Sequence, residues 1–174
     1  DFGKFSKMIT ALYADQADWL WVGTTQEIAL YDRYTDQFVL PQEVYKGFVL
    51  PKGAWIKKVL EDQDGHIWVL TQNLGLFCYS KPERKMLALS IAGTKPEKII
   101  TFVMNSQGRK IASTSNKVYE GFGQEFAPLP LREARFFEGK VISEVAIVKD
   151  KIWAITDEAE VTILNPNSRG SFES

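Results

Sequence analysis

The sequence predicts an all-β protein made of about four repeated units, each of four short antiparallel strands. Three observations support this fold class. Short runs rich in β-branched and aromatic residues recur, turn signals of Asp, Gly, Asn or Lys separate them, and the repeat length is roughly 40 to 50 residues. The runs at one shared repeat position read "WLWVGT", "HIWVLT", "KIAST" and "KIWAIT". A period of that length suits four short strands better than a pair of helices.

The first two units match residue by residue. Four pairs of identical residues are each separated by 47 positions: Ile9 and Ile56, Asp15 and Asp62, Trp21 and Trp68, Thr24 and Thr71. The third unit has Ile111 where the others have Trp, and the fourth restores Trp153; these spacings are 43 and 42 positions. We therefore treat residues 1–174 as one segment with repeats at approximately 9–55, 56–98, 99–140 and 141–174.

Composition narrows the classes of function. In 174 residues, 45% apolar and 13% aromatic side chains provide enough material for a hydrophobic core. The net charge is -1 and no basic block stands out, so nucleic acid is not an expected partner. The one cysteine, Cys78, lies in a predicted strand and is expected to be a buried hydrophobe. No apolar run approaches the roughly 20 residues of a membrane helix, and we expect a soluble chain.

Two tryptophans are candidates for ligand contact. Trp21, Trp68 and Trp153 share one repeat position, so we expect them to pack between neighbouring sheets. Trp19 and Trp55 have no counterparts in the other units. Sugars stack their apolar faces on indole rings, which makes Trp19 and Trp55 candidate ligand-binding residues. Packing, beside Trp21 or at a strand start, is the alternative for both.

The polar repeat positions predict structural roles. Asp15 and Asp62 lie one full repeat apart, so we expect them to bind turn backbone rather than to form a catalytic pair. The single histidine, His66, follows the Asp64-Gly65 turn and has no His or Cys partner at metal-ligand spacing. No metal, cofactor or catalytic residue is therefore expected. Four threonines are expected to satisfy backbone groups at strand ends: Thr24, Thr71, Thr114 and Thr156.

The motifs resemble a known family. "I-x-x-L-x-x-D-x-x-D-W-L-W-V-G-T" and "I-x-x-V-x-x-D-x-D-G-H-I-W-V-L-T-x-x-x-G-L" are similar to the two-component regulator propeller repeat. The resemblance implies blades of a β-propeller in the periplasmic sensor region of a hybrid two-component histidine kinase. Such regions bind breakdown products of glycans and control glycan utilisation genes. Departures are Ala17-Asp18 for Asp-Gly, Glu27-Ile28 near the Gly-Leu place, and Leu70 for the Gly of Gly-Thr.

The leading hypothesis is thus a non-enzymatic sensory segment with a glycan ligand. One alternative is a propeller scaffold for protein interaction without small-molecule sensing; another is a propeller lyase or hydrolase, against which the single histidine argues. Four units fall short of the six to eight blades that most commonly close a propeller. We expect a piece of a larger propeller whose partners are other blades of the parent protein or a second copy in a homodimer.

Overall fold

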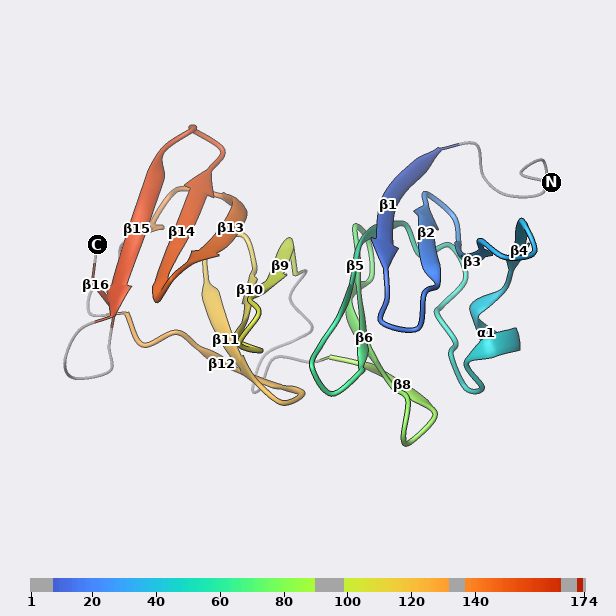
Figure 1. Ribbon diagram of the computed structural model, residues 1–174. Coiled ribbons are helices and arrows are strands. Elements are labelled where there is room, and N and C mark those ends of the chain that lie inside the picture. Colours follow the sequence, from blue (N-terminus) through green and yellow to red (C-terminus); the bar gives the residue numbers. More distant parts are fainter. Residues whose placement is uncertain (1–7, 90–98, 132–136, 167–171, 174) are drawn as a thin grey trace. The chain divides into compact units, whose positions relative to one another are not determined.

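The computed structural model describes residues 8–89, 99–131, 137–166 and 172–173. It contains four antiparallel sheets of four strands, each connected in chain order (Figure 1). The chain divides into two compact units, Asp1–Leu89 and Ser90–Ser174, and each unit holds two sheets. The predicted all-β fold class is confirmed. In the described ranges, no helix has the length and apolar character needed to cross a membrane.

The first unit contains the first and second sheets and one short helix, α1 (Pro41–Val44). The first sheet consists of β1 (Ile9–Ala14), β2 (Leu20–Thr24), β3 (Ile28–Asp32) and β4 (Gln37–Val39). The second consists of β5 (Ile56–Glu61), β6 (Ile67–Thr71), β7 (Gly75–Ser80) and β8 (Lys85–Ala88). Both have the same register: Tyr13 pairs with Trp21, and Leu60 pairs with Trp68. The 47-residue offset therefore reflects equivalent places in two similar sheets.

The second unit contains the third and fourth sheets. The third consists of β9 (Thr101–Met104), β10 (Lys110–Ser113), β11 (Val118–Phe122) and β12 (Glu125–Pro128). The fourth consists of β13 (Ile142–Val148), β14 (Lys151–Thr156), β15 (Val161–Pro166) and β16 (Phe172–Glu173). Ile111 pairs with Val103 and Trp153 pairs with Ala146, which places both residues at the repeat position of Trp21. The end of the second repeat, at residues 90–98, lies outside the described residues.

The core of the first unit lies between its two sheets. Trp21 is fully buried there, as predicted, with Ile28 and Leu30 of its own sheet. The second sheet covers these side chains with one apolar face: Ile56, Val59, Ile67, Val69, Phe77 and Tyr79. Alternation along each strand places these residues on one side, because successive side chains of a strand point to opposite faces. A buried tryptophan ring contributes on the order of 150 to 250 Å² to such an interface.

The second unit has an equivalent core. Ile111 is buried at the Trp21 position and packs with residues of the fourth sheet: Ile142, Val145, Ile152, Ala154 and Leu164. Trp68 and Cys78 are also buried, as predicted. The prediction is wrong for Trp153, which is only partly buried. Ile152 and Ala154 point into the core, so Trp153 between them points to the opposite face of the fourth sheet.

The threonine prediction holds in the first unit and fails in the second. Thr24 Oγ1 donates to the Glu27 carbonyl, and Thr71 Oγ1 donates to the Gly75 carbonyl. Thr114 Oγ1 and Thr156 Oγ1 are buried without a hydrogen-bond partner in the described part of the chain. The backbone N–H of each threonine closes the turn in these loops, at 2.9 Å to the Lys117 carbonyl and 3.0 Å to the Glu160 carbonyl, as the Thr24 N–H does at 2.9 Å to the Glu27 carbonyl.

Candidate functional site

One end of the first unit carries a cleft of about 630 Å³. Because the strands are antiparallel, the loop between β2 and β3 lies at the same end of the sheets as the start of β5. The linker between β4 and β5 (residues 40–55, the β4–β5 linker) begins and finishes there. We call this end the cleft end, and the opposite end, which carries the β1–β2 and β5–β6 loops, the Asp15 end. The volume is within the range of about 300 to 1,000 Å³ that is typical of small-molecule sites.

The β2–β3 loop forms one wall of the cleft through Gln26, Glu27 and Ile28. Thr24 fixes this loop. Its Oγ1 accepts hydrogen bonds from the N–H groups of Gln26 at 3.2 Å and Glu27 at 3.0 Å and donates to the Glu27 carbonyl. A short loop held by three hydrogen bonds to one hydroxyl presents its side chains in a defined place.

The β4–β5 linker forms the other wall, with Leu40, Gln42 and the run from Leu50 to Ala54. Asn73, in the β6–β7 loop, holds the end of this linker: Oδ1 accepts from the Trp55 N–H at 3.0 Å, and Nδ2 donates to the Gly53 carbonyl at 2.9 Å. The Gln72 N–H also donates to the Trp55 carbonyl at 2.8 Å. The linker is therefore anchored to the second sheet at the rim of the cleft.

An aromatic cluster lies between the cleft and the core of the first unit. Phe48 lines the cleft and is itself buried. Its ring lies 5.3 Å from the ring of Trp21 and 5.3 Å from that of Tyr79, while Tyr45 stacks on Trp21 at 5.5 Å. Rings packed at these distances form a rigid apolar base.

The polar groups of the cleft are available to a ligand. The amides of Gln26 and Gln42, the carboxylate of Glu27 and the ammonium of Lys52 line it. Within the described residues, none of these four side-chain ends makes a hydrogen bond or ion pair with another protein group. The carboxylate and the ammonium offset each other in charge, and the two amides are neutral. The site above the aromatic cluster therefore has little net charge. It suits a neutral ligand with hydroxyl groups and apolar faces.

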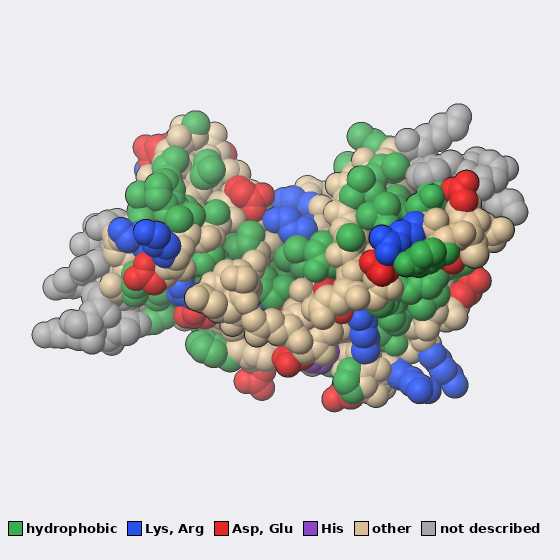
Figure 2. All heavy atoms as spheres, in the orientation of Figure 1, with side chains coloured by type: hydrophobic (Ala, Val, Ile, Leu, Met, Phe, Trp, Pro, Cys, Tyr) green, Lys and Arg blue, Asp and Glu red, His purple; other side chains and the backbone are tan. Residues whose placement is uncertain are grey.

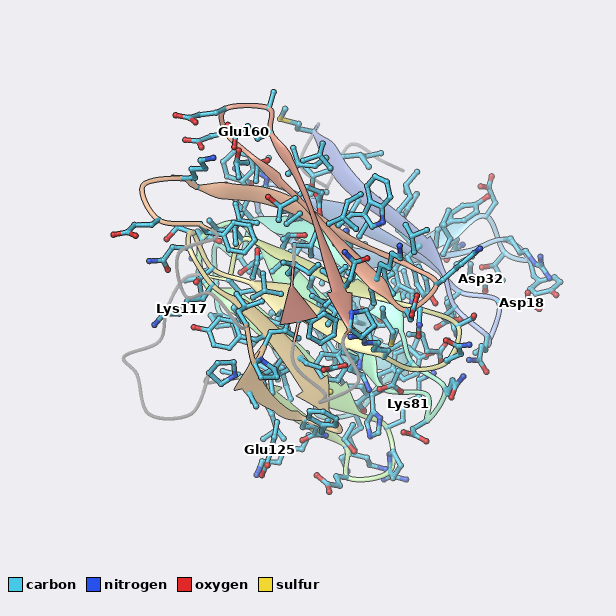
Figure 3. All side chains as sticks on the ribbon, turned by 90° about the vertical axis from the view of Figure 1, so that its left-hand side faces the viewer. Asp18, Asp32, Lys81, Lys117, Glu125 and Glu160 are labelled. Atoms are coloured by element: carbon cyan, nitrogen blue, oxygen red, sulfur yellow. The ribbon has the colours of Figure 1, made fainter. Side chains whose placement is uncertain are left out.

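The two candidate tryptophans lie at opposite ends of the first unit. Trp55 is at the cleft end, between the cleft-lining residues Ala54 and Ile56, and is 41% exposed. Trp19 is at the Asp15 end and is partly buried against the core. Its backbone N–H donates to Asp15 Oδ1 at 2.9 Å. Asp18 and Asp32 mark this end in Figure 3, and Arg33 joins the β1–β2 loop to the β3–β4 turn by a 3.0 Å ion pair with Asp18. Trp19 and Trp55 thus do not belong to one site.

Several titratable side chains lie at the Asp15 end, and their polar atoms form hydrogen bonds or ion pairs with other protein groups. Asp15 Oδ2 accepts from Trp21 Nε1 and from the Tyr45 hydroxyl, each at 2.9 Å. Glu61 is buried and binds Lys81 at 2.6 Å and the Gln16 N–H at 2.7 Å. Burial, and next the hydrogen bond to Asp15, raises the pKa of the Tyr45 hydroxyl well above its usual value. The hydrogen bond from Tyr45 to Asp15 holds the β4–β5 linker against the first sheet.

Asp62, Asp64 and His66 also lie together, with ligand atoms within 4.8 Å of one another. Sequence spacing did not predict this grouping. Asp62 Oδ1 accepts from the N–H groups of Asp64 and His66 and lies 3.1 Å from His66 Nδ1, while Oδ2 accepts from Trp68 Nε1 at 2.8 Å. The carboxylate is used by the turn, as predicted for Asp15 and Asp62. The grouping therefore closes the β5–β6 loop.

Sequence reasoning missed the cleft because most of its residues lie in the β4–β5 linker, which has no aligned counterpart. A signal was present in the repeat spacing. The first interval is 47 positions, against 43 and 42 for the next two, so the first linker is the longest. Extra residues between repeats of similar sheets mark a place where the chain departs from the shared pattern, and such places often carry function.

No protein-family model matches the sequence, and no curated protein matches it. The fold of the chain does match solved structures. The extracellular domain of the hybrid two component system BT3049 from B. thetaiotaomicron aligns with a TM-score of 0.71 and 13% identity, over 97% of this chain and 24% of that chain. The Dos1 propeller aligns with a TM-score of 0.65 and 11% identity, over 98% and 50%. Virginiamycin B lyase from Staphylococcus aureus aligns with a TM-score of 0.60 and 11% identity, over 95% and 58%.

These likenesses show the fold: the chain is built of β-propeller-type blades, as its repeats predicted. The chain spans 24% of the length of the BT3049 extracellular domain. A domain of a signalling system and a lyase share this fold, so the function has to be argued from the site.

Proposed function

We propose that this chain is a ligand-binding segment of the extracytoplasmic sensory region of a hybrid two-component histidine kinase. The observation that carries the proposal is the cleft in the first unit, whose polar side chains are free to bind a ligand. The fold likeness to the extracellular domain of BT3049 and the resemblance of the first two repeats to the two-component regulator propeller repeat support the sensory class.

The proposed ligand is a neutral oligosaccharide, and the proposed output is the control of glycan utilisation genes. Amide and carboxylate groups at the rim match sugar hydroxyls, because each can bond two of them. Leu40, Leu50 and Pro51 in the cleft wall offer apolar surfaces for the C–H faces of a sugar ring, and Trp55, 41% exposed, stands next to the lining at the cleft end. A strongly acidic ligand fits less well, because Lys52 is the one cation among the described lining residues and Glu27 stands in the same cleft.

The proposed mechanism is a shift between receptor states. A ligand in the cleft touches both the β2–β3 loop and the β4–β5 linker, so it favours conformations in which these two walls are close together. The receptor can respond only by as much as the ligand binds one state better than the other. The segment itself is proposed to be non-catalytic, because the buried carboxylates of Asp15 and Asp62 are bonded by the fold.

Isothermal titration of the purified chain with a panel of neutral and acidic oligosaccharides tests the proposal. We expect saturable binding of a neutral member. Gln26→Ala and Lys52→Ala should each weaken it by about 2- to 10-fold, as expected for the loss of one hydrogen bond. Trp55 is not part of the lining, so Trp55→Ala should weaken the binding only of oligosaccharides long enough to reach it. Gln16→Ala, an exposed glutamine at the opposite end, is the matched control and should bind normally.

Other results would point elsewhere. Binding that is lost in Trp19→Ala but kept in the cleft variants would place the ligand at the Asp15 end. An absence of binding to every oligosaccharide would favour the interaction scaffold over the sensor. The sequence of the full-length gene separates the same two classes, since a transmembrane helix followed by kinase motifs selects the sensor.

A further inference from the structure

The second unit carries a polar hollow of about 500 Å³ between two of its turns. It lies at the end of the third and fourth sheets that corresponds to the Asp15 end of the first unit, because the β9–β10 loop and the β13–β14 turn are the equivalents of the β1–β2 and β5–β6 loops. Five residues line it: Asn105, Gln107, Arg109, Lys149 and Asp150. We call it the Arg109 hollow. The two sheets that form its walls pack on each other within one unit, so these walls do not depend on any further blade.

Hydrogen bonds across the hollow fix its walls. Arg109, at the end of the β9–β10 loop, binds Glu120 through Nε at 2.7 Å and donates from Nη1 to the Asp150 carbonyl at 2.8 Å. Its guanidinium also lies over the Phe172 ring, 5.4 Å from the ring centre. On the same loop, Asn105 Oδ1 accepts from the Arg109 N–H at 2.9 Å. A residue of the third sheet thus holds the turn of the fourth, and a site whose walls are already in place loses less entropy on binding.

Several polar groups of the hollow are available to a ligand. Arg109 Nη2, Lys149 Nζ, Gln107 Nε2 and the Asp150 carboxylate make no hydrogen bond or ion pair with another protein group in the described chain. Three of these groups are donors, two of them charged, and the fourth is an acceptor. Figure 2 shows positive and negative side chains close together at the surface of the second unit. The hollow therefore offers donors for an anionic group beside an acceptor for a hydroxyl group.

In the first unit, a carboxylate of the protein bonds with groups of this kind. Glu61 accepts the Gln16 N–H at 2.7 Å and binds Lys81 at 2.6 Å, which joins the β1–β2 loop to the second sheet. Ile147 has the position of Glu61 in the fourth sheet, since each directly follows the strand partner of the repeat-position tryptophan. Ile147 packs against the core and cannot accept a hydrogen bond from the turn. The second unit thus keeps cations between its turns without the carboxylate that the first unit supplies.

We propose that the Arg109 hollow binds a small polyhydroxy acid. The carboxylate of the ligand bonds with Arg109 Nη2 and Lys149 Nζ, because charged donors form the stronger hydrogen bonds to a carboxylate. A hydroxyl group of the same ligand donates to the Asp150 carboxylate. A simple anion fits less well because Asp150 repels it, and a neutral polyol leaves both cations without a partner. The site and its ligand class are distinct from the cleft of the first unit and from its proposed neutral oligosaccharide.

Titration of the ¹⁵N-labelled chain, followed by two-dimensional NMR, tests the proposal with three probes. D-Gluconate should bind with a dissociation constant of about 1 mM or below, as expected for a ligand of this size. Sorbitol, which has the hydroxyl chain without the carboxylate, and acetate, which has the carboxylate without hydroxyls, should bind at least about tenfold more weakly. The backbone signals that shift with gluconate should be those of Gln107, Arg109 and Lys149, whereas those of Gln26 and Lys52 in the cleft should not move.

Three variants identify the groups that bind the ligand. Lys149→Gln should weaken gluconate binding by at least about tenfold, because it removes a charged hydrogen bond. Asp150→Asn should weaken the binding of gluconate but not that of acetate. Lys151→Gln changes an exposed lysine beside the same turn and outside the lining, so it is the matched control and should bind gluconate normally. Circular dichroism establishes that each variant is folded.

Four results would overturn the proposal. One is the absence of gluconate binding up to about 20 mM. The second is stronger gluconate binding by Asp150→Asn, since the hollow would then be a simple anion site. Equal losses in Lys149→Gln and Lys151→Gln would show a general attraction of charge instead of a site. Shifts confined to the cleft signals would place gluconate in the first unit. None of these results depends on whether the cleft binds an oligosaccharide, so the two proposals can fail separately.

Discussion

At the scale of single residues, the repeats show why an aspartate accompanies the tryptophan. Where Trp68 is present, both oxygens of Asp62 act as acceptors, one for the turn backbone and one for the indole N–H. In the third sheet Ile111 replaces tryptophan, and Asn105 suffices: its Oδ1 accepts from Gln107 and Arg109 N–H groups. An amide has one acceptor oxygen where a carboxylate has two. In the first three sheets the residue at the turn thus matches the residue on the strand, whereas the fourth sheet has Val148 at the equivalent position and leaves Trp153 Nε1 without a partner in the described chain.

This relation predicts unequal costs for two opposite changes. Asp62→Asn turns an amide N–H₂ toward a neighbouring donor, so a buried N–H loses its acceptor, and the free energy of unfolding should fall by about 1 to 3 kcal/mol. Asn105→Asp keeps the acceptor for both backbone groups, and we expect a change of no more than about 0.5 kcal/mol. Urea unfolding followed by circular dichroism measures both. Equal costs would show that the indole bond to Asp62 contributes little.

Residue roles were predictable where they depend on local spacing. Asp15 and Asp62, which directly follow the first strand of their sheets, were expected to bind the turn backbone, and they do so. The threonines were predicted by the same repeat logic, yet Thr114 and Thr156 make no such bond in the described chain. A shared repeat position identifies a place in the fold, but the hydroxyl bonds only where the loop geometry brings a backbone group within reach.

At the scale of elements, the close approach of two sheets depends on Gly23. A Cβ built at this position would lie 2.5 Å from Ile56 Cγ2, in the neighbouring sheet. Thr10 Oγ1 also donates to the Ile56 carbonyl at 2.5 Å, so a side chain of the first sheet is bonded to the backbone of the second at this point. The glycine is needed for space and not for an unusual backbone angle, since its φ is not positive.

Gly23→Ala should therefore destabilise the first unit by about 1 to 3 kcal/mol, although alanine in place of glycine within a strand is ordinarily stabilising. Combining it with Ile56→Ala removes the nearer of the two clashing atoms, Cγ2, and leaves the Ile56 Cβ at 2.8 Å. We expect the cost of the double variant to be at least about 1 kcal/mol below the sum of the two single costs. Denaturant midpoints of the four proteins give the coupling energy. Additive costs would mean that the sheets move apart freely.

The elements themselves were predicted better than the linker that joins them. Strands could be found from their period, composition and turns, because each sheet repeats the same pattern. The β4–β5 linker occurs once, and tertiary contacts determine its path: Tyr45 reaches Asp15 at one end of the sheets, while Gly53 is bonded by Asn73 at the other. No pattern in the linker's own sequence encodes these contacts. The cleft could not be predicted for the same reason.

At the scale of the whole molecule, the repeat predicts both the packed faces and the free ones. Four similar sheets have alternating apolar faces, and each face is buried only where another sheet follows or precedes it. The division into two compact units was not visible in the sequence, because the repeat positions run through all four sheets without a change in pattern. Leu12 is 63% exposed at the repeat position where Val59 is buried, so one repeat position can be covered in one sheet and open in another.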